Sequence, residues 1–206
     1  MAERPDRLFV AVPLPPDSLA ACVALIDGVR RGPFGGVPRW VHVENLHLTV
    51  RFLGETPPDL TPDAALAVRD ALAGARAFDV VLAGAGAFPE TRKPRALWLG
   101  IERGAPELGA LADALDPALE PLGWPRDDRP YRPHLTVARL DRSAISASEA
   151  IAADLGDAAA SWRTAFRADR VVMYRSHLGG GPPRYEPIVD IPLAGTSPFP
   201  GDATSV

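Results

Sequence analysis

Two copies of one tetrapeptide carry the residue types in this sequence that are best suited to chemistry. His-Leu-Thr-Val occurs at residues 47–50 and again at residues 134–137. On a β-strand, residues two apart project from the same face, so each histidine shares a face with the threonine that follows it. The leucine and valine of each copy should face a core and hold the histidine and threonine in register.

Two opposed imidazoles suit the cleavage of a phosphodiester. A neutral histidine can take a proton from the nucleophile, while a protonated histidine gives a proton to the leaving oxygen. The ordinary pKa of histidine, about 6.5, makes both forms available near neutral pH. Threonine hydroxyls can donate hydrogen bonds to the non-bridging phosphate oxygens, so this chemistry requires no metal ion.

The surroundings of the two copies indicate a duplicated unit. Each copy follows an apolar strand and a helix, the two strands being residues 8–12 and 97–101. Each copy also precedes a further strand, residues 78–88 or 164–166. This repeated order predicts two similar lobes, in which His47 with Thr49 and His134 with Thr136 face one another across a cleft.

Hydrophobic periodicity and turn residues predict the other elements. Helices are predicted from Pro16 to Gly28 or Gly32, from Thr61 as N-cap to about residue 75, over 105–119 and over 143–155. Strands are predicted over 7–13, within 40–53, and over 78–88, 96–102, 134–137, 164–166, 170–174 and 185–193. Residues 1–193 would form one bilobal domain, and the tail 194–206, which lacks periodicity, should be flexible.

Composition and charge restrict the classes of protein to which the chain can belong. The 206 residues are 47% hydrophobic, which is enough for a core and argues against general disorder. The net charge of −4 argues against a sequence-independent nucleic-acid binder, although it allows a local phosphate site. Cys22 is the only cysteine, so an internal disulfide and a cysteine-based zinc site are excluded. With no apolar run of about 18 residues and no signal-peptide pattern, we expect a cytoplasmic protein that avoids membranes, monomeric and without an obligate protein partner.

At these residues the sequence resembles the two-histidine (2H) phosphoesterases. It is most similar to the bacterial and archaeal RNA 2′,3′-cyclic phosphodiesterases, historically called 2′-5′ RNA ligases. The resemblance extends from Arg7 to about Leu193. The segments that carry it are RLFVAVPLP, ENLHLTVRFLGE, FPETRKPRALWLGI, RPYRPHLTVARL and RSHLGGGPPRYEPI.

The resemblance implies an α+β fold of two pseudo-twofold-related lobes, each an antiparallel sheet with flanking helices, around a central cleft. It implies hydrolysis of a terminal RNA 2′,3′-cyclic phosphate to a 2′-phosphomonoester, without a metal ion or another cofactor. Some relatives also join or reverse 2′-5′ RNA linkages. By resemblance, the catalytic residues are His47 and His134, and the substrate-binding residues are Thr49, Thr136, Arg139 and Phe9, with Phe9 lining a nucleoside pocket.

The two arginines that follow the motifs differ in the face they should occupy. By strict alternation Arg139 lies on the face opposite His134, and it reaches the phosphate only if the strand bends or bulges after Val137. Arg51 shares the His47 face and is a second candidate for the phosphate contact. Phe52, by the same alternation, should point toward the core.

Further aromatic residues are candidates for contact with RNA. Tyr131 and Arg132 lie in the loop that leads into the second motif, so they could contact RNA at the rim of the cleft. Three of the four tryptophans, including Trp98, lie in apolar strand contexts or beside helices and are expected to pack in the core.

We hypothesise that His134 activates water and that His47 protonates the departing ribose O3′, although the symmetric motifs do not by themselves assign these roles. A second interpretation keeps this chemistry and changes the substrate to a small cyclic nucleotide or a 2′-5′ oligonucleotide. A third is a non-catalytic module that binds RNA ends. A fourth is a metal hydrolase, which EDTA would inhibit.

Overall fold

Helices and strands are interleaved along the whole of the described chain. The computed structural model describes residues 5–141, 145–177, 179 and 181–195. The helices in these ranges are α1 (Pro16–Arg30), α2 (Thr61–Ala71), α3 (Ala105–Leu119) and α4 (Ile145–Ala159). The strands in these ranges are β1 (Asp6–Pro13), β2 (Arg39–Trp40), β3 (His47–Thr56), β4 (Phe78–Phe88), β5 (Ala96–Arg103), β6 (Leu135–Arg139), β7 (Arg163–Ala168), β8 (Arg170–His177) and β9 (Arg184–Pro192). None of the described helices is long and apolar enough to cross a membrane.

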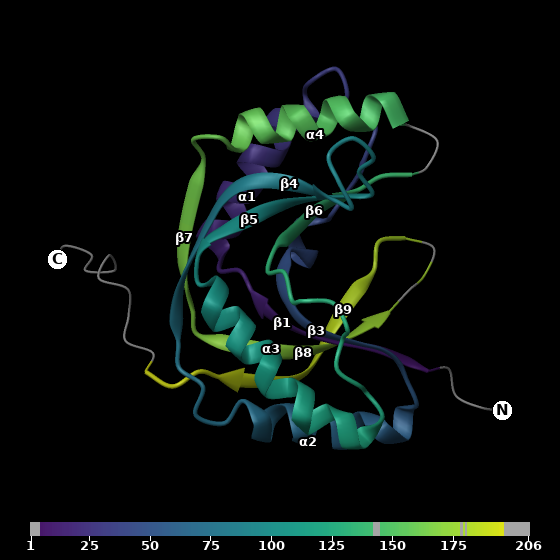
Figure 1. Ribbon diagram of the computed structural model, residues 1–206, viewed down its shortest axis with the longest axis vertical. Coiled ribbons are helices and arrows are strands. Elements are labelled where there is room, and N and C mark those ends of the chain that lie inside the picture. The colour runs from purple at the N-terminus through teal and green to yellow at the C-terminus, as the bar shows by residue number, and fades with distance from the viewer. Residues whose placement is uncertain (1–4, 142–144, 178, 180, 196–206) are drawn as a thin grey trace.

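The strands form two antiparallel sheets, one in each lobe (Figure 1). The first sheet has the strand order β3-β1-β8-β9, and the second has the order β2-β6-β5-β4-β7. When the two-residue strand β2 is left out, the two orders correspond. Each begins with a motif strand, β3 or β6, and continues with the apolar strand that comes before it in the chain, β1 or β5. The predicted α+β architecture with two antiparallel sheets is confirmed.

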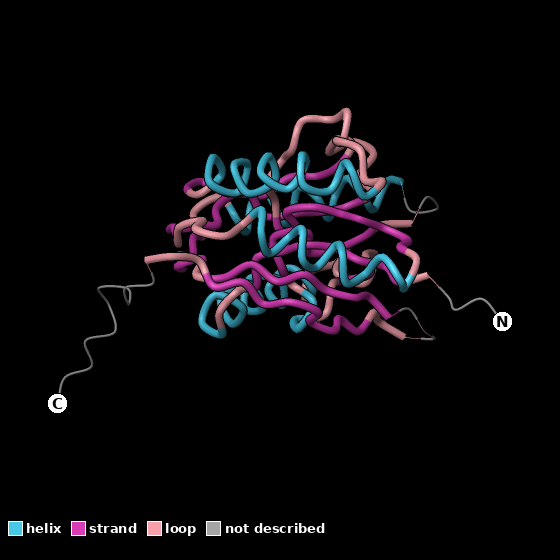
Figure 2. Tube along the Cα trace, turned by 90° about the horizontal axis from the view of Figure 1, so that it is seen from below, coloured by secondary structure: helices cyan, strands magenta, loops and turns pink. Residues whose placement is uncertain are grey.

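Helices cover the outer faces of the two sheets. In Figure 1, α2 lies below the first sheet, α3 crosses in front of it, and α4 lies above the second. Seen from below, helices and strands overlap over the same area, as expected for helices layered on sheets (Figure 2). Although α1 follows β1 in the chain, it packs against α4 and β7, whereas α3 follows β5 and packs against α2 and β3. Each lobe is therefore covered by a helix that follows a strand of the other lobe.

The helix α3 shows how local sequence sets these elements. Leu108, Leu111 and Leu115 recur at helical spacing and are buried, as the sequence predicts. Gly104 precedes the helix with a φ of 94°, and a Cβ at this position would lie 2.8 Å from the carbonyl oxygen of Asp79. The turn from β5 into α3 therefore requires glycine.

The predicted grouping of strands into sequence halves is wrong for β4. This strand was expected to complete the first half, but it pairs with β5 and β7 in the second sheet. Its place in the first sheet is taken by β8, which pairs with β1. Because β4 and β5 are consecutive and antiparallel, a short connection suffices to pair them. The edge of β1 is then free to pair with β8.

Four smaller expectations concern the ends of elements. Thr61 begins α2, but its hydroxyl donates to Asp6 Oδ2 at 2.9 Å and makes no capping hydrogen bond, so it ties the helix to β1. The same helix ends at Ala71 rather than near residue 75. In the predicted tail, Ala194 forms a parallel bridge with Arg76, and residues 196–206 lie outside the described residues. Residues 143 and 144 of the predicted fourth helix also lie outside the described residues.

Candidate active site

The two motif histidines lie where the two sheets approach each other. His47 is the first residue of β3, and His134 immediately precedes β6. These two strands contact one another across the lobes. The histidines are close enough for a positive charge on His134 to lower the pKa of His47. The structure therefore brings together the pair that the sequence singles out.

Both imidazoles are held in the same way. His47 Nδ1 lies 2.8 Å from the carbonyl oxygen of Asn45, and His134 Nδ1 lies 2.6 Å from that of Arg132. A carbonyl oxygen only accepts, so Nδ1 carries the hydrogen in both rings and donates it. The Nε2 atom of each neutral imidazole is then the basic nitrogen, available for proton transfer.

Asn45 is a site residue that sequence reasoning missed. Its side chain is buried, and its Nδ2 donates to the carbonyl oxygen of Pro183 at 2.7 Å. Asn45 thus orients His47 through its backbone and ties the turn before β9 to the segment that leads into β3. Asn45 stands two residues before the first motif, and only its place in the segment shared with the resembling family could have indicated it.

A β-bulge at Val137 brings Arg139 to the face of the second motif. Thr136 pairs with Trp98, but Ala138 pairs with Leu97, which leaves Val137 as the extra residue. Arg139 pairs with Ala96, which lies two residues from Trp98 and so on the same face as Trp98 and Thr136. The condition that the sequence set for Arg139 is met, and its charge acts on both histidines.

A bulge at the equivalent position of the first motif has the opposite effect on Arg51. Thr49 pairs with Ala11 and Arg51 with Val10, so Val50 is the extra residue. Arg51 consequently points toward α3, where Nη2 donates to the carbonyl oxygen of Pro125 and lies 3.5 Å from Asp116 Oδ1. The prediction that Arg51 shares the His47 face is therefore wrong.

The two motif threonines precede the bulges and keep the predicted face. Thr49 and Thr136 are both half-buried. Tyr131 lies beside Thr49, and its hydroxyl donates to the carbonyl oxygen of Thr49 at 2.8 Å. Burial raises the pKa of this phenol, so Tyr131 stays neutral. It also ties the loop before the second motif to β3.

The ring of Phe9 packs against the imidazole of His47. The two rings stack with centroids 4.8 Å apart, and Tyr174 and Tyr185 pack on Phe9 at 5.3 and 4.8 Å. Phe9 is only 4% exposed, so it does not offer a surface to a nucleoside as the resemblance implied. A cavity of about 350 Å³ lies beside His47 instead, with Asn45, Tyr174 and Tyr185 in its wall.

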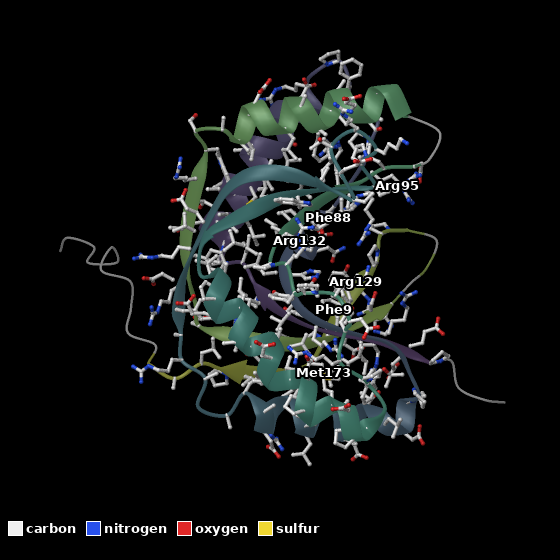
Figure 3. All side chains as sticks on the ribbon, viewed as in Figure 1. Phe9, Phe88, Arg95, Arg129, Arg132 and Met173 are labelled. Atoms are coloured by element: carbon white, nitrogen blue, oxygen red, sulfur yellow. The ribbon has the colours of Figure 1, made fainter. Side chains whose placement is uncertain are left out.

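Phe88 and Trp98 surround His134. Phe88 meets the imidazole edge-on at 4.8 Å, and Trp98 lies 6.3 Å from it between ring centroids. The sequence predicts core packing for Trp98, but this residue lines a cavity of about 550 Å³ beside His134. Arg132 lines the same cavity, and its guanidinium lies 4.9 Å from the centroid of the Phe88 ring. Figure 3 shows Phe88 and Arg132 in the upper lobe and Phe9 in the lower lobe.

Burial favours the neutral form of both histidines in the free protein. Burial lowers the pKa of His47 from 6.5 to about 4, and although the Asn45 carbonyl opposes this change, the charges of Arg139 and His134 add to it. Burial also lowers the pKa of His134, again with a contribution from Arg139. An anion bound between the rings would stabilise their protonated forms and raise both pKa values.

The candidate site offers nitrogen and hydroxyl groups rather than a set of metal ligands. In the part of the chain that the structure describes, no group of three or more His, Cys, Asp or Glu side chains could hold a metal ion. The arrangement can bind an anion through Arg139, Thr49 and Thr136, and it can move protons at two imidazole nitrogens.

Known proteins share this arrangement of sheets. A family model described as the 2′-5′ RNA ligase superfamily matches residues 15–180. The chain belongs to this superfamily. A superfamily relative from Geobacillus stearothermophilus, named RNA 2′,3′-cyclic phosphodiesterase, is 32% identical over 191 residues, which are 92% of this chain and 58% of that protein.

Two comparisons with Escherichia coli support membership of the 2′-5′ RNA ligase superfamily. The RNA 2′,3′-cyclic phosphodiesterase of strain K12 is 28% identical over 184 residues, which are 89% of this chain and 94% of that protein. A crystal structure of E. coli LigT complexed with NADP⁺ has a TM-score of 0.68 at 25% identity, over 92% of this chain and 98% of that one. This chain therefore spans nearly the whole E. coli protein but 58% of the Geobacillus one.

Proposed function

We propose that the protein hydrolyses the 2′,3′-cyclic phosphate at the end of an RNA and leaves a 2′-phosphomonoester. The observation that carries this proposal is the matched pair of imidazoles. Each donates its Nδ1 hydrogen to the carbonyl oxygen two residues earlier, so each directs its chemistry through Nε2. The names of the Geobacillus and E. coli relatives, both RNA 2′,3′-cyclic phosphodiesterases, support the choice of substrate.

The phosphate would bind between the two motif strands. Thr49 and Thr136 would donate hydroxyl hydrogen bonds to its non-bridging oxygens. Arg139, whose charge acts on both histidines, would balance the negative charge that grows on these oxygens as the nucleophile attacks. A guanidinium and two hydroxyls can do this without a metal ion.

The position of the ribose assigns the roles of the two histidines in our proposal. The cavity beside His47, with Tyr174 and Tyr185 in its wall, would take the terminal nucleoside. The leaving oxygen O3′ then lies toward His47. An in-line attack brings water from the opposite side of the phosphorus, where His134 stands.

In the reaction, the water oxygen forms a bond to phosphorus as His134 Nε2 accepts one of the water protons. The bond between phosphorus and O3′ breaks, and protonated His47 gives its Nε2 proton to O3′. The phosphate stays on O2′, and proton exchange with solvent restores both rings. Because the pKa of His47 is about 4 in the free protein, its protonated form depends on the negative charge of the bound phosphate.

The test is to incubate the protein with an RNA ending in a 2′,3′-cyclic phosphate, in the presence of EDTA, and to map the product phosphate. A 2′-phosphate is the expected product. A 3′-phosphate would assign the protein to another class of phosphodiesterase. Absence of turnover both with and without EDTA would favour a module that binds RNA ends without catalysis. Turnover without EDTA that is lost when EDTA is present would indicate a metal hydrolase.

A further inference from the structure

Phe52 is an exposed aromatic residue that the proposed reaction does not use. Its side chain is 67% exposed, although alternation along β3 predicts that it faces the core. The bulge at Val50 accounts for the difference, because Phe52 pairs with Phe9 and so shares the face of Phe9. The two rings are in contact, with centroids 6.2 Å apart.

One aromatic ring, that of Phe9, separates Phe52 from His47. Phe9 stacks on His47 on one side and meets Phe52 on another, so the two outer rings flank one buried ring. In the second motif the residue two places after the bulge is Arg139, and in the first motif it is Phe52. The fold thus presents a cation from one lobe and an exposed aromatic ring from the other.

The loop before the second motif runs along the edge of β3 beside Phe52. Trp124 Nε1 donates to the carbonyl oxygen of Leu53 at 3.0 Å, and Tyr131 is bound to Thr49 on the other side of Phe52. Between these two anchors the loop carries Arg126, which forms ion pairs with Asp113 and Asp116. It also carries Arg129, whose side chain is 89% exposed and lies 3.6 Å from Asp127 Oδ1. An exposed ring beside a loop that offers arginines has the two components of a single-stranded nucleic-acid site, a stacking surface and a cation for the backbone.

We propose that Phe52 is a stacking platform for the base of the nucleotide that precedes the cyclic-phosphate end. This inference rests on the proposed function, which places the terminal nucleoside in the cavity beside His47 on the Tyr174 and Tyr185 side of Phe9. The preceding nucleotide leaves the terminal ribose at O5′ and needs a surface outside that cavity. Phe52 is the exposed aromatic surface that the described residues provide next to the site. The substrate is then an RNA strand rather than a cyclic mononucleotide.

The test compares a cyclic mononucleotide with a dinucleotide that ends in the same cyclic phosphate. The wild-type protein should show the higher kcat/KM on the dinucleotide. Phe52→Ala should lower kcat/KM about tenfold on the dinucleotide, from the loss of one base–aromatic stack, and change it less than about twofold on the mononucleotide. Phe52→Trp should restore the preference.

An abasic sugar in place of the first nucleotide supplies a readout that a structural role of Phe52 would not move. On this substrate the wild-type protein should fall to the level of the Phe52→Ala variant. Leu66→Ala removes another exposed apolar side chain, 48% exposed on α2, and should change neither rate.

Two outcomes would overturn the inference and leave the proposed function intact. One is equal kcat/KM of the wild-type protein on the two substrates. The other is an equal effect of Phe52→Ala on both substrates. An equal loss would mean that Phe52 acts only through Phe9 and His47, and no effect on either substrate would mean that Phe52 does not contact the RNA. If the wild-type protein hydrolyses neither substrate, the proposed function itself fails.

Discussion

Val50 and Val137, the last residues of the two His-Leu-Thr-Val copies, are each the extra residue of a β-bulge. A bulge reverses the alternation of faces beyond it. Arg51 consequently turns away from the site and Arg139 turns into it, the reverse of what strict alternation predicts. The same feature turns Phe52 out of the core. Two equivalent irregularities therefore decide which charged and aromatic groups surround the phosphate site.

Arg139→Gln should lower kcat/KM and move its pH optimum upward. The lost hydrogen bonds to a charged phosphate correspond to about 10- to 100-fold in kcat/KM. The positive charge of Arg139 lowers the pKa of both histidines, so its removal lets both hold a proton at higher pH. The measurement is the pH dependence of kcat/KM for the variant and the wild-type protein. An unchanged optimum would contradict the position we assign to Arg139.

Arg51→Gln provides the matched comparison. Arg51 is 11% exposed and holds Pro125 and Asp116, so its loss should destabilise the fold by about 1–3 kcal/mol. The pH optimum should stay where it is in the wild-type protein. Thermal unfolding and the pH profile together separate the two arginines, and a shifted optimum in Arg51→Gln would place its charge in the site after all.

His47→Ala and His134→Ala should each lower kcat at least about a hundredfold, because each removes one member of the acid–base pair. Circular dichroism should show the wild-type fold for both. Substantial turnover by the double variant would refute the two-histidine scheme.

The kinetic pH profile should be bell-shaped, because turnover needs one protonated and one neutral imidazole. Burial lowers both pKa values in the free protein, so kcat/KM should be maximal below pH 6.5, whichever histidine carries the proton. In the complex the phosphate raises both values, so kcat should peak at a higher pH. A flat profile between about pH 5 and 9 does not fit histidine chemistry.

The stability of the fold should also depend on pH through His47. Its pKa is about 4 in the folded protein against 6.5 when unperturbed, so the unfolded chain binds more protons between these values. The free energy of unfolding should therefore decrease as the pH falls from 6.5 to 4. His47→Gln should lose part of this decrease, as measured by denaturant unfolding across the range. An identical decrease in both proteins would mean that His47 titrates normally.

The sequence by itself determined the features that depend on neighbours along the chain. Periodicity located the helices, with Leu108, Leu111 and Leu115 as an example, and the strand period paired His47 with Thr49 and His134 with Thr136. Trp98 shows where this information ends, because an apolar strand context does not say which face of the sheet meets a core and which meets a cleft. The sequence could likewise state only a condition for Arg139.

Tertiary structure decided what depends on the partner strand. Val50 and Val137 become extra residues only because β1 and β5 pair across them in one register, and pairing energy belongs to two strands at once. In the same way, β4 joins the second sheet because β5 is its nearest antiparallel partner, and Asn45 acquires its role when Pro183, far along the chain, meets it. Contacts between distant segments therefore set the direction of each side chain around a pair of histidines that the sequence had already marked.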